Sequence, residues 1–221
     1  MENAKGHKGA AMEGFIARMY NRNARRYSSG VYRVWAHDLA DQIEPGSTVL
    51  EIAPGPGYLA IELVKRRQCK VVALDISKTF LEIARSNARE AGVEIDFRLG
   101  DVSSMPFGAA EFDFILCTSS FKNFTEPLVA LNEMCRVLKP GGRVWLSDLR
   151  RDITDEAIDN FVSRSMKARG LAGVFMKRTF KGMLRQRAYT SAQFKDMVSR
   201  TPFSACAMKD NLIDFEASLR K

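Results

Sequence analysis

Three carboxylates stand at or beside the ends of apolar runs in the first half of the chain. Glu51 lies inside the first run, Asp75 ends the second, and Asp101 follows the third after a single glycine. Such runs are typical of parallel strands, whose carboxyl ends meet along one edge of a sheet. We therefore expect the three acids to gather there as an acidic crevice. It would attract a cationic ligand and repel a phosphate-bearing dinucleotide.

The segment after the first run has the composition of a nucleotide-binding loop. Gly55 and Gly57 allow the backbone to turn sharply and to approach a ligand, and Pro54 stiffens the loop. Asp75 follows Gly55 by 20 residues, a spacing that suits an acid bonded to ribose hydroxyls. The alternatives are an ordinary strand-to-helix turn and an aspartate that caps the next helix, although Ser77 is the better cap.

Alternating strand and helix patterns predict the framework that positions these residues, a Rossmann-like α/β domain with a doubly wound sheet. The predicted strands are 48–53, 70–75, 94–99, 112–117 and 143–148, with weaker ones near 204–208 and 212–219. The predicted helices are 58–67, 77–91, 126–138 and 191–199, and 11–43 and 153–184 also have helical patterns. Pro140, Gly141 and Gly142 predict a turn before the fifth strand.

A chain of 221 residues is short for two full domains, so we expect one domain spanning 1–221. Its predicted parts are an N-terminal helical cap (1–46), a cofactor-binding core (47–150), a basic helical lid that is the acceptor region (151–200) and C-terminal strands (201–221).

The net charge of +8 is concentrated in the flanks of the chain. Residues 160–195 carry nine Lys or Arg and no Asp or Glu. Their mixture with Phe, Met and Leu predicts an amphipathic lid with a cationic outer face. Such a lid would attract an anionic acceptor or an anionic membrane that bears a lipid-like acceptor, while a solvated helix face is the simpler interpretation.

Several classes of protein are disfavoured by composition. No stretch reaches the roughly 20 apolar residues of a transmembrane helix, and residues 1–9 lack a secretory signal, so we expect a cytoplasmic protein. The four cysteines form no C-x-x-C pair, and there are only two histidines. We therefore expect neither a metal site nor a disulfide framework.

Taken together, the motifs resemble the class I S-adenosylmethionine-dependent methyltransferase superfamily, in its UbiE-like small-molecule branch. The matching segments are 51–57, 74–77, 100–102, 105–107, 111–115 and 136–142, in the order of the family. The resemblance implies the sheet order 3-2-1-4-5-7-6 with strand 7 antiparallel. It also implies S-adenosyl-L-methionine as cofactor and S-adenosyl-L-homocysteine as product. Ala53-Pro54 departs from the usual glycine and small residue, so we expect a stiffer loop that still binds cofactor.

The resemblance also implies roles for single residues. Glu51 and the 53–57 backbone would line the methionine end of the cofactor, and Asp75 would hold the ribose. Asp101 would accept from the adenine amino group. The amino-terminal tyrosines would close over the cofactor, although core packing explains them equally well. The cofactor-binding residues implied are Glu51, Ala53, Pro54, Gly55, Gly57, Asp75, Ile76, Asp101, Val102, Cys117, Thr118, Tyr20 and Tyr27.

The implied activity is transfer of a methyl group to a small-molecule acceptor by in-line displacement, which mainly requires alignment and exclusion of water. A general base would help only for a hydroxyl or phenol acceptor. The weak catalytic candidates are His37 and Lys122, and a structural role is the alternative for each. Lys122 lies in 119–124, a loop that either faces the acceptor or merely enters the next helix.

Two other functions stay open. A pI of about 9.5 with clustered arginines would suit an RNA or nucleic-acid methyltransferase. However, residues 117–120 contain no N-P-P-Y-like motif, so we expect no stable nucleic-acid partner. A non-catalytic S-adenosylmethionine-binding protein would keep the same pocket. A nicotinamide dehydrogenase is disfavoured because Ala60 replaces the third glycine of its fingerprint. The sequence leaves a homodimer open and does not identify the acceptor or the methylated atom.

Overall fold

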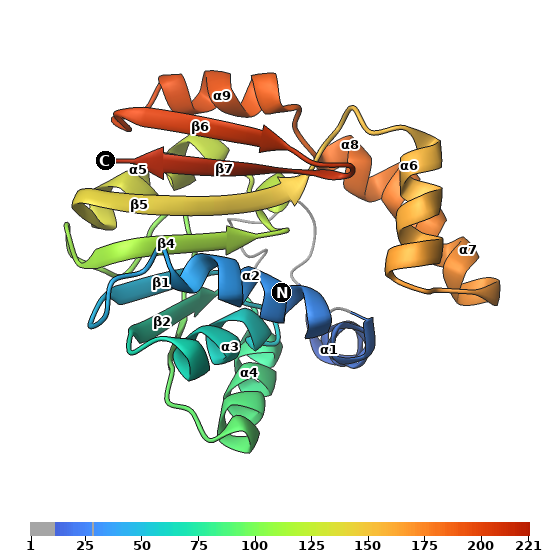
Figure 1. The fold of residues 1–221 in the computed structure, drawn as a ribbon, viewed down its shortest axis with the longest axis horizontal. Coiled ribbons are helices and arrows are strands. Elements are labelled where there is room, and N and C mark those ends of the chain that lie inside the picture. The colour runs from blue at the N-terminus through green and yellow to red at the C-terminus, as the bar shows by residue number, and fades with distance from the viewer. Residues whose placement is uncertain (1–11, 28) are drawn as a thin grey trace.

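The computed structural model describes residues 12–27 and 29–221 (Figure 1). The prediction that the chain lacks a secretory signal rests on residues 1–9, which lie outside the described residues. The strands are β1 (Thr48–Ile52), β2 (Lys70–Asp75), β3 (Asp96–Leu99), β4 (Phe112–Thr118), β5 (Leu138–Leu149), β6 (Ala205–Asp210) and β7 (Asp214–Arg220). They form one sheet in the order β3-β2-β1-β4-β5-β7-β6. β1 to β5 pair in parallel, and β7 is antiparallel to β5 and β6. The predicted Rossmann-like topology is confirmed.

The helices fall into three groups along the chain. The first comprises α1 (Gly14–Tyr27) and α2 (Ser29–Ala40). The helices between and beside the strands are α3 (Tyr58–Arg66), α4 (Lys78–Ala91), α5 (Pro127–Val137) and α9 (Ser191–Ser199). The third group follows β5 and comprises α6 (Asp155–Asn160), α7 (Gly170–Thr179) and α8 (Arg185–Arg187), with π-helical stretches at Phe161–Ser165 and Phe180–Leu184.

Two hydrophobic layers cover the sheet because successive residues of a strand point to opposite faces. Val49 of β1 packs with α2 and α3, whereas its neighbour Leu50 packs with α5 and α9. α4 adds a third cluster on the same face as α3, against Ala73 and Phe97. The core therefore holds β1, β2 and β4 rigidly, which fixes the positions of the loops at their carboxyl ends.

The predicted turn at 139–142 is not a turn, because β5 begins at Leu138 and includes these residues. Leu138 pairs with Phe112 and Arg143 with Phe114, so the extra residues form an irregularity in the strand. The physical reason is backbone pairing with Lys221. Lys221 accepts from Gly141 N and donates from its own N to Gly142 O, and so it satisfies backbone groups that a turn would leave free.

The third group of helices stands apart from the two layers of the sheet. In Figure 1 α6 and α7 project beyond the carboxyl ends of the parallel strands. They pack around a small cluster that contains Ile153, Ile158 and Val162. The helical pattern predicted for 153–184 is present, with a break between the first π-helical stretch and α7. No helix in 12–27 or 29–221 is long and apolar enough to cross a bilayer.

Candidate functional site

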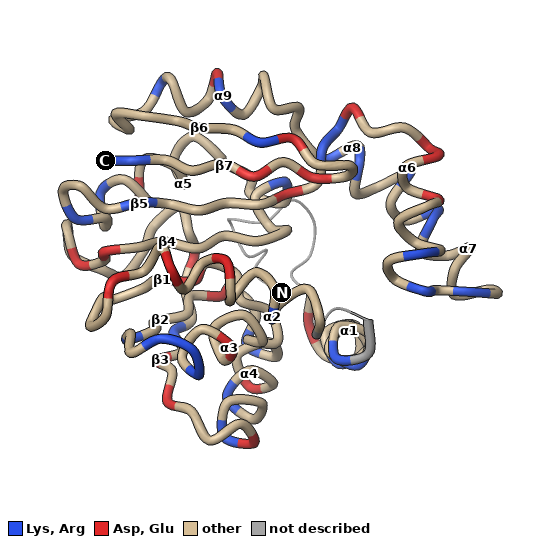
Figure 2. The backbone as a smooth tube through the Cα atoms, viewed as in Figure 1, with Lys and Arg blue, Asp and Glu red and all other residues tan. Residues whose placement is uncertain are grey.

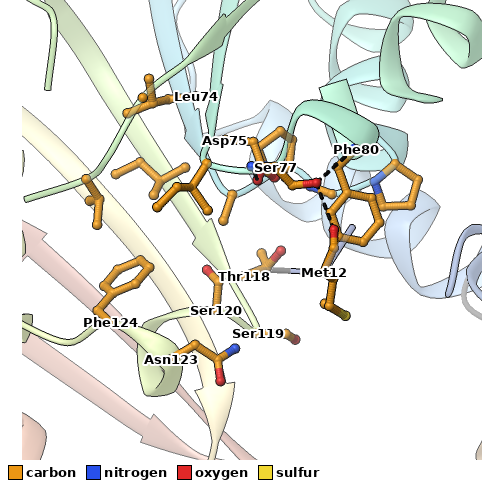
Figure 3. Close-up of a pocket in the computed structure, with 18 of the residues that line it drawn as sticks. Met12, Leu74, Asp75, Ser77, Phe80, Thr118, Ser119, Ser120, Asn123 and Phe124 are labelled. Atoms are coloured by element: carbon orange, nitrogen blue, oxygen red, sulfur yellow. Dashed lines mark hydrogen bonds between the residues drawn. The ribbon is translucent and has the colours of Figure 1, made fainter. Parts of the chain in front are cut away.

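A cleft opens to solvent at the carboxyl ends of β1, β2, β3 and β4. Its walls are the loops that follow the first four strands, and α1 and α2 each contribute a tyrosine. Figure 3 shows the loop after β4 facing Met12 and Phe80 across the space. The described lining residues are Met12, Tyr20, Tyr32, Ile52, Ala53, Pro54, Gly55, Pro56, Leu74, Asp75, Ile76, Ser77, Phe80, Gly100, Asp101, Val102, Thr118, Ser119, Ser120, Asn123 and Phe124.

Both carboxylate oxygens of Asp75 accept hydrogen bonds from the backbone. Its Oδ2 accepts from Gly55 N at 3.1 Å, and its Oδ1 accepts from Ser77 N at 2.9 Å. The helix cap is a different residue, because Ser77 Oγ accepts from Phe80 N at 3.0 Å. Burial raises the pKa of Asp75 to about 6, so the carboxyl is mainly ionised at pH 7. The capping alternative for Asp75 is thus wrong, and its carboxylate ties the first loop to the second.

The loop after β1 has an unusual backbone. Ala53 has a φ of 52°, and Gly55 and Gly57 have φ values of 53° and 80°, all in the left-handed region. A Cβ on Gly57 would lie 3.1 Å from the Cβ of Ala84, so this glycine also allows α3 and α4 to approach. Asn87 Nδ2 donates to Pro56 O at 2.9 Å and fixes the outer side of the loop.

The loop after β3 brings the second carboxylate to the cleft. Asp101 Oδ1 accepts from Ser103 N at 2.8 Å, and Val102 packs into the core behind it. A Cβ on Gly100 would lie 2.7 Å from Leu74 Cδ1, so a side chain here would force the buried Leu74 to shift. Asp75 and Asp101 therefore line one cleft, as the strand-end pattern predicts.

Glu51 has a different position from the other two acids. It is 1% exposed, it is not among the described lining residues, and its Oε2 has no hydrogen-bond partner in the described part of the chain. Burial raises the pKa of Glu51 to about 8, so this carboxyl is mainly neutral at pH 7. Asp75 and Asp101 thus line the cleft, whereas the buried Glu51 does not.

The loop after β4 closes the opposite side of the cleft. Thr118, Ser119, Ser120 and Asn123 line the space. Cys117 is buried outside the lining, where its Sγ lies 3.2 Å from Ser120 Oγ. Burial raises the pKa of Cys117 to about 12, so it is a thiol and not a thiolate at neutral pH.

The two catalytic candidates of the sequence lie outside the cleft wall. Lys122 is buried, and its Nζ donates to Asp148 Oδ1 at 2.8 Å and to Ser119 O. An ammonium engaged in this way is unavailable as a free base. His37 is exposed on α2 and is not among the lining residues.

Aromatic residues from the N-terminal helices cover one end of the cleft. Tyr20 lies edge-on to Phe80, with 5.6 Å between ring centroids, and Tyr32 also lines the space. Ser77 Oγ donates to Met12 O at 2.8 Å and holds the start of this segment. The side chain of Tyr27 lies outside the described residues. The sequence pattern missed Met12, Tyr32 and Phe80, because nothing in their spacing distinguishes them from ordinary core residues.

The electrostatics of the cleft restrict its ligand. The described residues that line the cleft include no lysine, arginine or histidine, but they include Asp75 and Asp101. A phosphate would find no cation there and two carboxylates to repel it. The residues fit a ligand that carries a sulfonium, an ammonium group and a ribose. Within the described ranges, no cluster of three or more His, Cys, Asp or Glu could hold a metal ion.

Known proteins with similar sequences support this interpretation. A family model described as a methyltransferase domain matches residues 49–142. A demethylmenaquinone methyltransferase of Deinococcus radiodurans is 37% identical over 145 residues, which are 64% of this chain and 60% of that protein. The ubiquinone/menaquinone biosynthesis C-methyltransferase UbiE of Laribacter hongkongensis is 32% identical over 149 residues, 62% of this chain and 61% of that protein. The chain thus matches about 60% of the length of these relatives.

The fold is shared over a larger part of the chain. A crystal structure from Methanococcus maripaludis, named for S-adenosyl-L-methionine-dependent methyl transfer, superposes with a TM-score of 0.77 at 20% identity. The match covers 96% of this chain and 95% of that one. The family match falls on the strands and loops that build the cleft, and the sheet order is the one that the sequence motifs imply. Residues 49–142 are thus similar in sequence to methyltransferase domains, and nearly the whole chain shares the fold of the solved structure.

Proposed function

We propose that this protein transfers a methyl group from S-adenosyl-L-methionine to a small-molecule acceptor. The observation that carries the proposal is a cleft with two carboxylates and no cation among its described lining residues. The relatives named above are C-methyltransferases of quinone biosynthesis or act on demethylmenaquinone. We therefore take a quinol-type ring carbon as the first acceptor to test.

Different residues of the cleft would bind different parts of the cofactor. Asp75 would accept from the ribose hydroxyls, because each of its oxygens uses one backbone N–H and keeps a lone pair. Asp101 would accept from the adenine amino group, between Ile76 and Val102. The methionine end would lie along the 53–57 backbone and Thr118. Glu51 would act from behind the wall, and Cys117 would contribute through its backbone.

The chemistry needs little more than alignment. When bound, S-adenosylmethionine supplies a methyl group already activated by positively charged sulfur. Ser119, Ser120 and Asn123 present hydroxyl and amide groups that can orient an acceptor opposite that methyl. A quinol-type ring carbon would become nucleophilic when a ring hydroxyl releases its proton to water. This carbon would take the methyl group as its bond to sulfur breaks, and the ring C–H proton would then pass to water. Closure by Tyr20 and Tyr32 would exclude water.

The test begins with calorimetric titration of the full chain with S-adenosylmethionine and, separately, with NADH. Micromolar affinity for the first alone is the expected result. Turnover is then followed as release of S-adenosylhomocysteine with a reduced demethylated quinone as acceptor. Binding of NADH alone, or of neither ligand, would contradict the cofactor assignment. Cofactor binding without turnover on any acceptor would favour a non-catalytic binding protein.

RNA affinity measured at several salt concentrations tests the alternative of a nucleic-acid methyltransferase. That alternative predicts tight RNA binding that weakens steeply as the salt concentration rises. Binding that stays weak at low salt is the result expected for a small-molecule enzyme. A cytoplasmic location, a homodimer and the anionic or lipid-like character of the acceptor stay predictions.

A further inference from the structure

α7 exposes an unpartnered apolar stripe, defined here as Leu171, Val174 and Phe175. These side chains are 90%, 65% and 64% exposed. Their spacing of three and four residues places them on one face of the helix. The other face holds α7 in the fold, because Gly173 is buried against Ala168 and Met176 packs on the cluster around Ile158. The stripe is therefore a second apolar face on a helix that is already packed.

Four exposed cations close to the stripe in the sequence have no ion-pair partner among the described residues. Arg164, Lys167, Arg169 and Arg178 are exposed, and none forms an ion pair or a side-chain hydrogen bond within 12–27 and 29–221. Arg178 follows Leu171 by seven residues and so lies on the same face of α7. Figure 2 shows several Lys and Arg positions, in blue, in the part of the chain around α7 and α8.

Three other cations of residues 160–195 have a different role. Lys177, Lys181 and Arg185 form ion pairs with Asp155 or Asp159 and tie α7 and α8 to α6. Asp155 and Asp159 are thus already paired with cations of this segment. The predicted cationic outer face stays a prediction, and the structure adds that α7 also exposes apolar side chains.

We propose that the outer face of α7 docks on an anionic lipid surface. Contiguous exposed apolar side chains usually mark a binding surface. An apolar stripe that can enter the acyl boundary, bordered by cations that can reach lipid phosphates, is complementary to such a membrane. A second copy of the same face would bring unpaired cations together and be repelled. A nucleic-acid backbone would neutralise the cations but leave the stripe in water.

α7 lies at the end of the molecule where the cleft opens. α7 projects beyond the carboxyl ends of the parallel strands, the edge at which the cleft opens (Figure 1). α8 connects the two, because Arg187 donates to Oδ1 of Asn123, a cleft residue, at 3.5 Å. A docked chain would therefore take a lipid-like acceptor from the membrane itself. The docking does not rest on the proposed transfer and is measured without turnover.

The experiment is co-sedimentation of the full chain with vesicles of phosphatidylcholine alone and of phosphatidylcholine mixed with phosphatidylglycerol. Binding only to the mixed vesicles is expected. The triple variant Leu171→Ser, Val174→Ser, Phe175→Ser should lower this affinity at least about tenfold. The matched control is Val129→Ser, an exposed valine on α5, which should bind as the wild type does.

The charge contribution has its own pair of variants. Arg178→Glu should weaken binding to the mixed vesicles several-fold, whereas Arg89→Glu should not, although both cations lie in the last turn of a helix. Unchanged circular dichroism and thermal melts show that the variants fold. Absence of vesicle binding, equal binding to neutral vesicles, or equal losses in test and control variants would overturn the proposal. So would a dimer in solution that the triple variant abolishes, or RNA binding without vesicle binding.

Discussion

The ammonium of Lys122 lies 2.8 Å from Oδ1 of Asp148, with side-chain exposures of only 6% and 2%. Asp148 also accepts from the backbone N–H groups of Lys122 and Leu149, each at 2.7 Å. The pair joins the loop after β4 to the end of β5. Lys122 therefore positions the cleft wall formed by Ser119 and Asn123.

Replacing one partner of this pair should be costly. Lys122→Met would leave the buried Asp148 carboxylate without its counter-charge, and we expect the free energy of unfolding to fall by about 3 to 5 kcal/mol. Urea denaturation followed by circular dichroism measures the change.

The control is an exposed ion pair of the same type. Lys139 lies 2.9 Å from Asp113, but these side chains are 41% and 36% exposed. Lys139→Met should cost no more than about 1 kcal/mol, because water screens the exposed pair. If the free energy of unfolding fell equally in the two variants, burial of the Lys122–Asp148 pair would not contribute to stability.

Cofactor affinity should depend on the ionisation of Asp75. Since its pKa is about 6 in the folded protein, the carboxyl becomes neutral as the pH falls below 6. A neutral carboxyl attracts the cationic cofactor less, so the Kd for S-adenosylmethionine should rise by up to about tenfold per pH unit below 6. Calorimetry between pH 5 and 8 measures this dependence, which Asp75→Asn should abolish.

At pH 8 Asp75→Asn should also weaken cofactor binding, by about 1 to 3 kcal/mol for the loss of the hydrogen bonds to the ribose that we propose. Asp38→Asn, at an exposed position on α2, serves as the control. A wild-type affinity in Asp75→Asn would show that this residue does not hold the ribose.

The buried carboxyl of Glu51 should make stability depend on pH. Its pKa is raised from 4.5 to about 8 on folding, so between these values the folded state keeps a proton that the unfolded state has released. The free energy of unfolding should therefore fall as the pH rises through this window, by up to about 1.4 kcal/mol per pH unit. Denaturation of Glu51→Gln should lack this component, whereas Glu82→Gln, at an exposed position on α4, should keep it.

The two glycines of the loop after β1 should differ in their tolerance of alanine. Both have positive φ, but only at Gly57 would a Cβ meet a neighbour, at 3.1 Å from Ala84 Cβ. Thermal unfolding should show a loss of about 1 kcal/mol for Gly55→Ala and a larger one for Gly57→Ala. Adding Ala84→Gly should recover part of the second loss. Equal losses at both positions would mean that only the backbone angle matters.

The sequence by itself determined the sheet and the strand-end acids. Alternation of apolar runs with helical patterns indicated five parallel strands, and parallel strands bring their carboxyl ends to one edge. Asp75 and Asp101 had to lie there, since each directly ends or follows a strand. Ser77 was recognisable as a helix cap because capping depends on residues only three apart in the chain.

Tertiary structure decided everything that depends on contacts between distant segments. Glu51 lies on β1, directly before the loop that lines the cleft, yet it is buried outside the lining, and this burial raises its pKa to about 8. Lys122 became a buried structural cation because Asp148, on another strand, reached it. The face of α7 that stays exposed was set by which side packed against Ile158. Sequence spacing gives the direction of a side chain within its own element, but only the packed neighbours decide what that side chain meets.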